Sequence, residues 1–435
     1  MEISPARLAA LDVLRVVRRG AFADRAFERV APSLDEADRR LAQELAYGVL
    51  RLRSRLDFVL GRLVKGGLER LSADVVDILR LGAYQLLELD RVPAYAAVSE
   101  AVEASKGAEG KGAAALTNAV LRRLSRESYD SFEFPLLEED ALGHLTTWGS
   151  HPGWLAERWM ARWPIEDVGR LVEYNNKQPP VYLSVAGARV EAMETLHSAA
   201  VRAEAVAPGR SSLRVDAGSV SRALALVDAV VQDPAAAAVV DYMALDPGSE
   251  VVDLCAAPGG KASLLAARGH HVWATDIAAG RLAVLQENRE RLGLSGLHVI
   301  RGDATRPPFA QARAVLLDVP CSGTGTLARH PDSRWRVQED DIGRLVELQR
   351  QLADAAAHIV TPGGMLVYAT CSLESEENEE QVEAFLHRWP EFELEAPPAG
   401  AMAGEFMKSD GSLRVLPQRH GLDGAYAARL RHRPA

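Results

Sequence analysis

Hydrophobic positions divide the chain into a helical first third and a later part in which strands alternate with helices. Through residues 1–126 apolar residues recur at helical spacing, as in the stripe Val75, Leu79 and Ala83. Runs of alternating β-branched residues are few there. The pattern therefore predicts an all-α domain over the first 126 residues.

From Gly248 onward, apolar runs of strand length alternate with helical stretches, which is typical of an α/β, Rossmann-like parallel sheet. We assign residues 235–435 to this α/β domain. The expected strands are 250–254, 271–276, 298–303, 313–318 and 364–370.

Two further segments lie between the helical and the α/β domains. Residues 127–150 contain six acidic residues and no Lys or Arg, which predicts an acidic linker. Residues 151–234 mix a helical stretch, Trp154–Trp159, with strand candidates at Val181–Val185 and Ser212–Val215. We interpret 151–234 as a small α+β connector domain and a candidate RNA-contacting part. The fold class is therefore multidomain.

Composition restricts the compartment. The chain has 435 residues, of which 48% are apolar, and its three cysteines lack the paired spacing of a disulfide framework or a zinc site. The N-terminus has no basic segment followed by an apolar core, and charges interrupt every apolar run before the ~20 residues that a membrane span needs. We expect a cytoplasmic protein with no membrane and no metal.

Positive charge is concentrated at the N-terminal end. The net charge is −10, but residues 1–126 carry 21 basic and 17 acidic side chains. Arginines on the outward faces of these helices could bind RNA phosphates, and a solvated surface is the alternative reading. The clusters are Arg15, Arg18 and Arg19; Arg51, Arg53 and Arg55; and Arg122, Arg123 and Arg126.

The first α/β strand opens into a glycine turn that could hold a cofactor against a helix start. The turn is not G-x-G-x-x-G, so a dinucleotide is weakly supported. Its residues are Cys255, Ala256, Ala257, Pro258, Gly259, Gly260 and Lys261.

Carboxylates recur at the carboxyl ends of the predicted strands. Asp253 lies just inside the first strand, and Asp276 ends the second, where a carboxylate can accept ribose hydroxyls. Asp303 ends the third strand, within reach of an adenine amino group or neighbouring backbone, and Asp318 ends the fourth. An acidic crevice suits a cationic sulfonium better than a pyrophosphate, so S-adenosylmethionine is favoured over NAD.

Cys321 and Cys371 follow two predicted strands and are candidates for covalent chemistry, although either alone could be a buried apolar residue. Carbon 5 of a pyrimidine becomes nucleophilic after a thiolate adds to carbon 6, and a base must later remove the carbon-5 proton. We expect a helix capped at Ser372 or Ser375 to lower the pKa of Cys371. The acids Glu374, Glu376 and Glu377 would oppose this effect.

The helical domain resembles the NusB family, and the similarity spans nearly the whole domain. This resemblance implies RNA binding without chemistry. The matching segments are Leu79–Leu87, Val92–Val98 and Thr117–Leu124.

The α/β domain resembles the Sun-type RNA (cytosine-5) methyltransferases, some of which carry a NusB-like domain. Several motifs in a fixed order make the resemblance specific. They are Asp253–Lys261, Asp276, Arg301–Asp303, Asp318–Gly325, Arg329–Asp332 with Trp335, and Ala369–Ser372.

This resemblance implies methylation of carbon 5 of a cytosine in small-subunit ribosomal RNA, with S-adenosylmethionine as the methyl donor. It makes Cys371 the nucleophile, and Cys321 a base or a thiol that assists release. It makes Asp318 a contact of both cofactor and target base, and it places the cofactor at 255–261, Asp276 and Asp303. Arg329, His330 and Lys261 are candidate RNA-orienting or surface residues.

Other functions stay open at this point. A transfer RNA cytosine-5 methyltransferase is the nearest alternative. A non-catalytic RNA-binding ribosome assembly factor is another, and the intact Cys321, Cys371 and Asp318 argue against it. A small-molecule methyltransferase would not need the roughly 250 residues that precede the cofactor strand. We expect a monomer whose partner is RNA.

Overall fold

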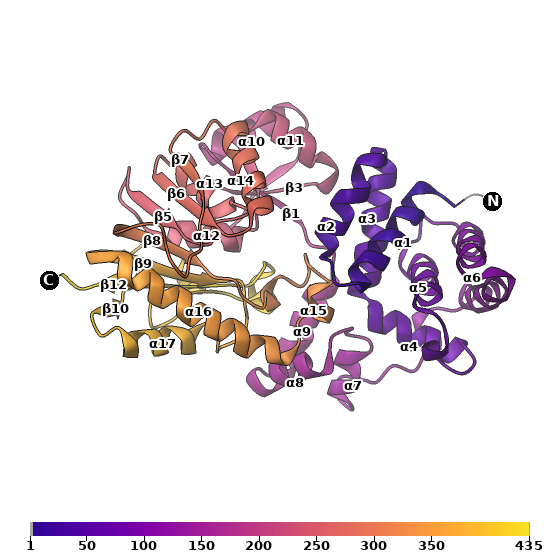
Figure 1. The fold of residues 1–435 in the computed structure, drawn as a ribbon. Helices are drawn as coiled ribbons and strands as arrows, with labels where there is room; N and C mark the ends of the chain where they lie inside the picture. The colour runs from indigo at the N-terminus through magenta and orange to yellow at the C-terminus, as the bar shows by residue number, and fades with distance from the viewer. Residues whose placement is uncertain (1–2, 435) are drawn as a thin grey trace. The chain divides into compact units, whose positions relative to one another are not determined.

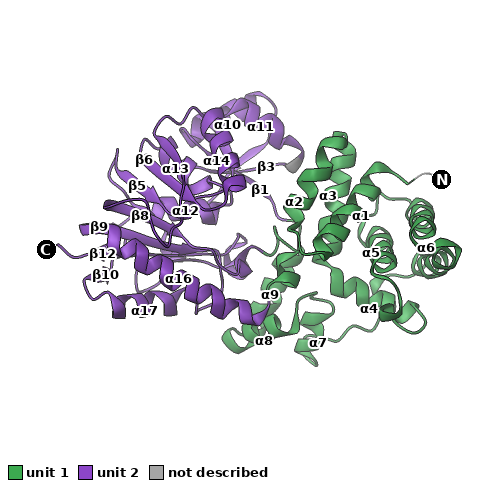
Figure 2. Ribbon diagram, in the orientation of Figure 1, with its two compact units in different colours: residues 1–178, 327–337 green, residues 179–326, 338–435 purple. Residues whose placement is uncertain are grey.

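The computed structural model describes residues 3–434 and consists of two compact units (Figure 2). Unit 1 comprises residues 1–178 and 327–337, and unit 2 comprises residues 179–326 and 338–435. Within the described residues, no helix is both long enough and apolar enough to pass through a lipid bilayer.

Unit 1 is helical, as the apolar periodicity of residues 1–126 predicts for its first part. Asp35 and Ser72 cap α3 and α5 by accepting backbone N–H groups of Asp38 and Val75. Its helices are α1 (Pro5–Arg18), α2 (Ala23–Val30), α3 (Glu36–Arg51), α4 (Arg53–Leu63), α5 (Ala73–Glu88), α6 (Ala94–Leu124), α7 (Ala141–Thr146), α8 (Gly153–Arg162), α9 (Ile165–Asn176) and α15 (Ser333–Arg336).

Close helix packing forms the core of unit 1. Leu45, Leu56 and Leu79 are fully buried in it. Gly82 allows α5 to approach α6, because a Cβ there would lie 2.5 Å from a methyl carbon of Leu121. Unit 1 therefore has a dense apolar core of its own.

The short segment 327–337 packs inside unit 1, far in sequence from its neighbours. The backbone N–H of Ala23 donates to Asp332, and the indole of Trp335 donates to the carbonyl of Leu50 at 2.7 Å. Arg334 is 1% exposed. Its guanidinium donates to the carbonyls of Arg51, Ser150, Asn175 and Leu327 and to the side chain of Asn176.

Unit 2 begins with a small antiparallel sheet in the order β2-β3-β1-β4, flanked by α10 and α11. Leu183 and Leu213 pair across it and bury one face against Leu196 of α10. The elements are β1 (Val181–Val185), α10 (Arg189–Ser198), β2 (Ala203–Ala205), β3 (Ser212–Val215), α11 (Val220–Leu226) and β4 (Ala229–Val231).

The main sheet of unit 2 has the order β10-β12-β9-β8-β5-β6-β7, with β11 paired to β12. The five predicted strands form its parallel part, and antiparallel strands from the C-terminus extend it. The strands are β5 (Glu250–Asp253), β6 (His271–Asp276), β7 (Leu297–Arg301), β8 (Ala312–Asp318), β9 (Val360–Thr370), β10 (Phe392–Leu394), β11 (Leu413–Val415) and β12 (Ala425–His432).

Helices cover both faces of this sheet (Figure 1). α12, α13 and α14 pack on one face and α16 and α17 on the other, each layer with its own apolar cluster. The bounds are α12 (Pro234–Met243), α13 (Gly260–Ala267), α14 (Ala279–Arg291), α16 (Glu339–Ile359), α17 (Glu379–Arg388) and α18 (Pro417–His420). Burial on both faces explains why the central strands are almost entirely apolar.

Candidate active site

The parallel strands place the predicted chemical groups at one edge of the main sheet. β8 pairs with β5 and β9 in parallel, so Asp253, Asp318 and Cys371 all lie at carboxyl ends of neighbouring strands. A cavity of about 670 Å³ lies elsewhere, lined by residues at the amino ends of the strands, including Glu250 and Ala312. That cavity is at the opposite edge from the thiols.

The glycine turn leads from β5 directly into α13. Gly259 has φ +105° and acts as the residue before the helix, and a Cβ there would lie 2.1 Å from Leu285. A Cβ on Gly260 would lie 2.9 Å from the amide nitrogen of Gln232. The positive φ of Gly259 favours glycine, and the close packing of both glycines lets the chain turn tightly into the start of α13.

Asp253 is a buried carboxylate beside the turn and is only 1% exposed. Neither of its oxygens makes a hydrogen bond of good geometry among the described residues, and the same holds for the hydroxyl of Ser263 and the amide oxygen of Gln232. Burial, together with the nearby charge of Asp318, raises the pKa of Asp253 to about 8. These unsatisfied polar atoms fit a polar, cationic cofactor.

Asp276 and Asp303 already have partners within the protein. Asp276 accepts the backbone N–H groups of Ala257 and Ala278 and pairs with Arg281 at 3.1 Å, so it fastens the glycine turn to the start of α14. Asp303 lies two residues beyond β7 and is exposed. It accepts the backbone N–H and hydroxyl of Thr305, and these bonds lower its pKa.

Cys321 and Cys371 meet at the ends of β8 and β9, and their sulfur atoms are 3.4 Å apart. Both residues are partly exposed. The backbone N–H of Gly325 donates to the carbonyl of Cys371 at 3.0 Å, and a Cβ on Gly325 would lie 2.6 Å from the same oxygen. The two loops therefore touch through backbone as well as through sulfur.

Lys261 and Asp318 form an ion pair next to the thiols, with Nζ 2.7 Å from Oδ2. Burial opposes the charge of Lys261, but the carboxylate of Asp318 outweighs it, and Cys371 also contributes, so the pKa of Lys261 is raised. A hydrogen bond that the thiol of Cys321 donates to the sulfur of Cys371, together with burial, raises the pKa of Cys321 well above its ordinary value.

Cys255, the third cysteine, lies apart from this pair. It is partly buried against the apolar cluster under α16, and burial and the charge of Asp253 raise its pKa. Because a protonated thiol is a poor nucleophile, Cys255 fits a structural role in the turn and not a role as nucleophile.

The expected helix start at Ser372 or Ser375 is wrong. α17 begins at Glu379; residues 372–374 are irregular and residues 375–378 form a turn. Glu377 points inward to bond with Ser372, and the Asn378 amide donates to the carbonyl of Ser372, which holds this segment away from helical geometry. Cys371 therefore does not lie at a helix N-terminus, and Lys261 supplies the positive charge near it.

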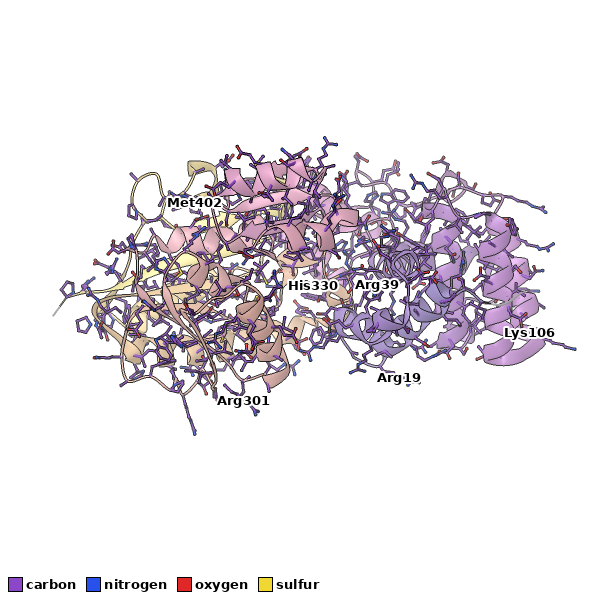
Figure 3. All side chains as sticks on the ribbon, turned by 90° about the horizontal axis from the view of Figure 1, so that it is seen from above. Arg19, Arg39, Lys106, Arg301, His330 and Met402 are labelled. Atoms are coloured by element: carbon purple, nitrogen blue, oxygen red, sulfur yellow. The ribbon has the colours of Figure 1, made fainter. Side chains whose placement is uncertain are left out.

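The expectation of three outward arginine clusters in unit 1 is partly wrong. Arg51 is buried, and Arg55 is largely buried, donates to the carbonyl of Trp148 and stacks on the ring of that residue. Arg18 pairs with Asp74 and Asp77. The exposed arginines of the three clusters are Arg18, Arg19, which Figure 3 labels, Arg122, Arg123 and Arg126.

Arg329 and His330 belong to the segment 327–337 in unit 1. His330 is exposed and labelled in Figure 3, and Arg329 is partly buried. An RNA-orienting role stays a prediction for both residues.

Three residues were not assigned a site role from the sequence. Glu377 is buried under both thiol loops, Arg334 holds the segment 327–337, and Ile277 exposes 60% of its apolar side chain directly after Asp276. One feature of the sequence could have pointed to Glu377. The dipeptide Cys-Ser follows both strands, as Cys321-Ser322 and Cys371-Ser372, and both serines bond to Glu377.

Comparisons with known proteins agree along the chain. Residues 240–431 match the model of the 16S rRNA methyltransferase RsmB/F family, residues 4–126 match the NusB family, and residues 151–221 match the ferredoxin-like domain of RsmF/B-like methyltransferases.

Individual relatives are similar over their full length. The chain is 34% identical to the probable ribosomal RNA small subunit methyltransferase B of Synechocystis sp., covering 99% of both, and 34% identical to ribosomal RNA small subunit methyltransferase B of Erwinia tasmaniensis, covering 97% of both. The crystal structure of PH0851 has a TM-score of 0.80 at 25% identity over 99% of both chains. A methyltransferase homologue from Pyrococcus horikoshii has a TM-score of 0.54 at 26% identity, covering 67% of this chain and 98% of its own.

Proposed function

Because the chain belongs to the RsmB/F family of 16S rRNA methyltransferases, we propose that it methylates a small-subunit rRNA cytosine through a covalent bond to Cys371. The protein is an S-adenosylmethionine-dependent RNA (cytosine-5) methyltransferase. The covalent step and the residue roles below are our proposal.

S-adenosylmethionine supplies an electrophilic methyl group on a sulfonium. The residues proposed to hold it are Asp276, Asp303, Asp318 and the turn 255–261. Two observations support this: α13 begins within the turn at Gly260, and the carboxyl group of Asp253 lies buried there without a hydrogen bond of good geometry. A cation in this crevice would gain from the surrounding carboxylates.

Cys371 is the proposed nucleophile. Its thiolate adds to carbon 6 of the cytosine, which makes carbon 5 electron-rich enough to accept the methyl group. The neighbouring Lys261 supports this role, because its positive charge interacts with Cys371 and can stabilise negative charge that develops beside the sulfur during attack. Asp318, fixed by the same lysine, is proposed to orient both the cytosine and the cofactor.

Cys321 is proposed to act in release. After methyl transfer, a base takes the proton from carbon 5, the electrons of that bond restore the ring double bond, and the carbon 6–sulfur bond breaks. Cys321 lies 3.4 Å from the Cys371 sulfur, and its raised pKa keeps it a thiol that can donate a proton to the departing sulfur. Either proton removal or assistance to the leaving thiolate fits this position.

One observation carries the proposal: the sulfurs of Cys321 and Cys371 lie 3.4 Å apart, next to the Lys261–Asp318 ion pair and the glycine turn. Methylation of small-subunit rRNA by purified protein tests it. Cys371→Ala is expected to abolish activity, and Cys321→Ala to accumulate a covalent protein–RNA adduct. Full activity of Cys371→Ala would refute the proposal.

The substrate is tested separately by bisulfite sequencing of cellular RNA with and without the gene. Loss of one cytosine-5 methyl group from small-subunit rRNA is the expected result, since the relatives carry that name. Loss from transfer RNA alone would replace the substrate but keep the chemistry. Normal methylation of all RNA, together with inactive purified protein, would favour an assembly factor.

A further inference from the structure

Glu377 is a buried carboxylate whose bonds converge on both thiol loops. It is 0% exposed and forms no ion pair among the described residues. Instead it accepts the backbone N–H of Ser322 and the amide of Gln349, both at 2.9 Å, and the hydroxyls of Ser322 and Ser372. Four donors thus compensate for the water that this carboxylate has lost.

The two serines directly follow the two cysteines. One carboxylate therefore bonds to the chain neighbour of Cys321 and to the chain neighbour of Cys371, and the serine hydroxyls themselves lie 3.0 Å apart. Adjacent Cα atoms are about 3.8 Å apart, so fixing each serine restricts the sulfur beside it.

Glu377 is itself held by residues of β9 and α16. The backbone carbonyl of Glu377 accepts the hydroxyl of Tyr368 at 2.7 Å. Gln349, on α16, donates to the carbonyl of Pro320 as well as to Glu377. Glu377 is therefore fixed to β9 through its backbone carbonyl and to α16 through its carboxylate, and the carboxylate in turn fixes both loops.

We propose that Glu377 is a positioning residue that sets the separation of the Cys321 and Cys371 sulfurs. This inference rests on the proposed covalent function. The carboxylate does not touch the reacting atoms; it acts through Ser322 and Ser372. A carboxylate that served only the stability of the fold could take its donors from any neighbouring element. Three of the four donors to Glu377 instead belong to Ser322 and Ser372, the residues beside the two thiols.

Glu377→Gln is the sharpest perturbation because it keeps the shape and replaces one acceptor oxygen with an NH₂ donor. If the NH₂ group replaces Oε2, the hydroxyls of Ser322 and Ser372 both lose the oxygen that accepts their hydrogen bonds, and the two loops shift. A shift of about 1 Å at reacting groups can cost about 100-fold in rate, so we expect kcat to fall about 100-fold. KM for RNA and the Kd for S-adenosylmethionine should stay unchanged, because the variant alters neither binding surface.

The matched control is Asp241→Asn. Asp241 is also a buried carboxylate of unit 2, accepts the backbone N–H of Arg210 at 2.9 Å and pairs with Arg268 at 2.7 Å. It lies near the end of α12 rather than among the thiol loops. The same chemical change there should lower the melting temperature without changing the reactivity of Cys371.

The experiment measures the rate of covalent attachment of full-length protein to small-subunit rRNA carrying 5-fluorocytidine, from which no carbon-5 proton can leave. The unaltered protein should become attached through Cys371. A rate of attachment that Glu377→Gln lowers and Asp241→Asn leaves unchanged supports the inference. Combining Glu377→Gln with Ser372→Ala should cost little more than either change alone, because both break one network.

Two results would overturn the positioning role. The first is attachment by Glu377→Gln at the unaltered rate. The second is a loss equal to that of Asp241→Asn at equal loss of stability, which would make Glu377 a general fold contact. Attachment that persists in Cys371→Ala would instead contradict the proposed function, so the two failures are distinguishable.

Discussion

Asp253→Asn tests whether the cofactor crevice contains a carboxyl group that keeps its proton in the folded state. Burial raises the pKa of Asp253 from 3.8 to about 8. Between these values the folded protein binds a proton that the unfolded chain does not, so stability is complete below the unfolded pKa and falls as pH rises toward 8. From about pH 5 to about pH 8 the loss corresponds to about 4 kcal/mol, because one pKa unit is about 1.4 kcal/mol.

The variant removes this loss, because an amide does not titrate. As pH rises from about 5 to about 8, the unaltered protein loses unfolding free energy through Asp253 and the variant does not. We therefore expect the variant to become more stable relative to the unaltered protein across that interval. The assay is thermal unfolding with and without S-adenosylmethionine. The transition whose melting temperature rises when the cofactor is added is the unfolding of unit 2. Parallel pH profiles of the two proteins would refute the buried, protonated Asp253.

Three further predictions follow from the contacts of the site and of unit 1. Lys261→Met is expected to lower kcat for RNA methylation by about 100-fold, because it removes the ion pair that fixes Asp318 in the site; an unchanged kcat would exclude the lysine. Gly325→Ala should abolish turnover but leave cofactor affinity intact, because its Cβ would lie 2.6 Å from the Cys371 carbonyl; retained kcat would contradict that packing. Arg334→Met should lower the free energy of unfolding of unit 1 by about 3 kcal/mol, because it leaves buried carbonyls unsatisfied; an unchanged denaturation midpoint would show that these bonds are dispensable.

Local patterns sufficed for the parallel strands and the glycine turn. Apolar runs bounded by glycine and aspartate mark β5, β6 and β8, because strands buried on both faces must be apolar along their length. The antiparallel extension by β10, β11 and β12 was not predicted. Those strands are short or depend on pairing with β9, which no local pattern records.

The two thiols could be expected together because parallel strands end at the same edge. Contacts between residues distant in sequence could not be expected. Nothing near Arg51 indicates that it lies beside Ala328, and nothing near Glu377 indicates that Ser322 bonds to it. The division of the chain at residues 126, 150 and 234 stays a proposal.

Peptide mapping of the adduct formed with 5-fluorocytidine-substituted small-subunit rRNA tests the central claim most directly. The account predicts a single modified peptide, in which a cytosine nucleotide is joined to the sulfur of Cys371. Attachment to Cys321 in place of Cys371, or efficient methylation with no adduct at either sulfur, would contradict it.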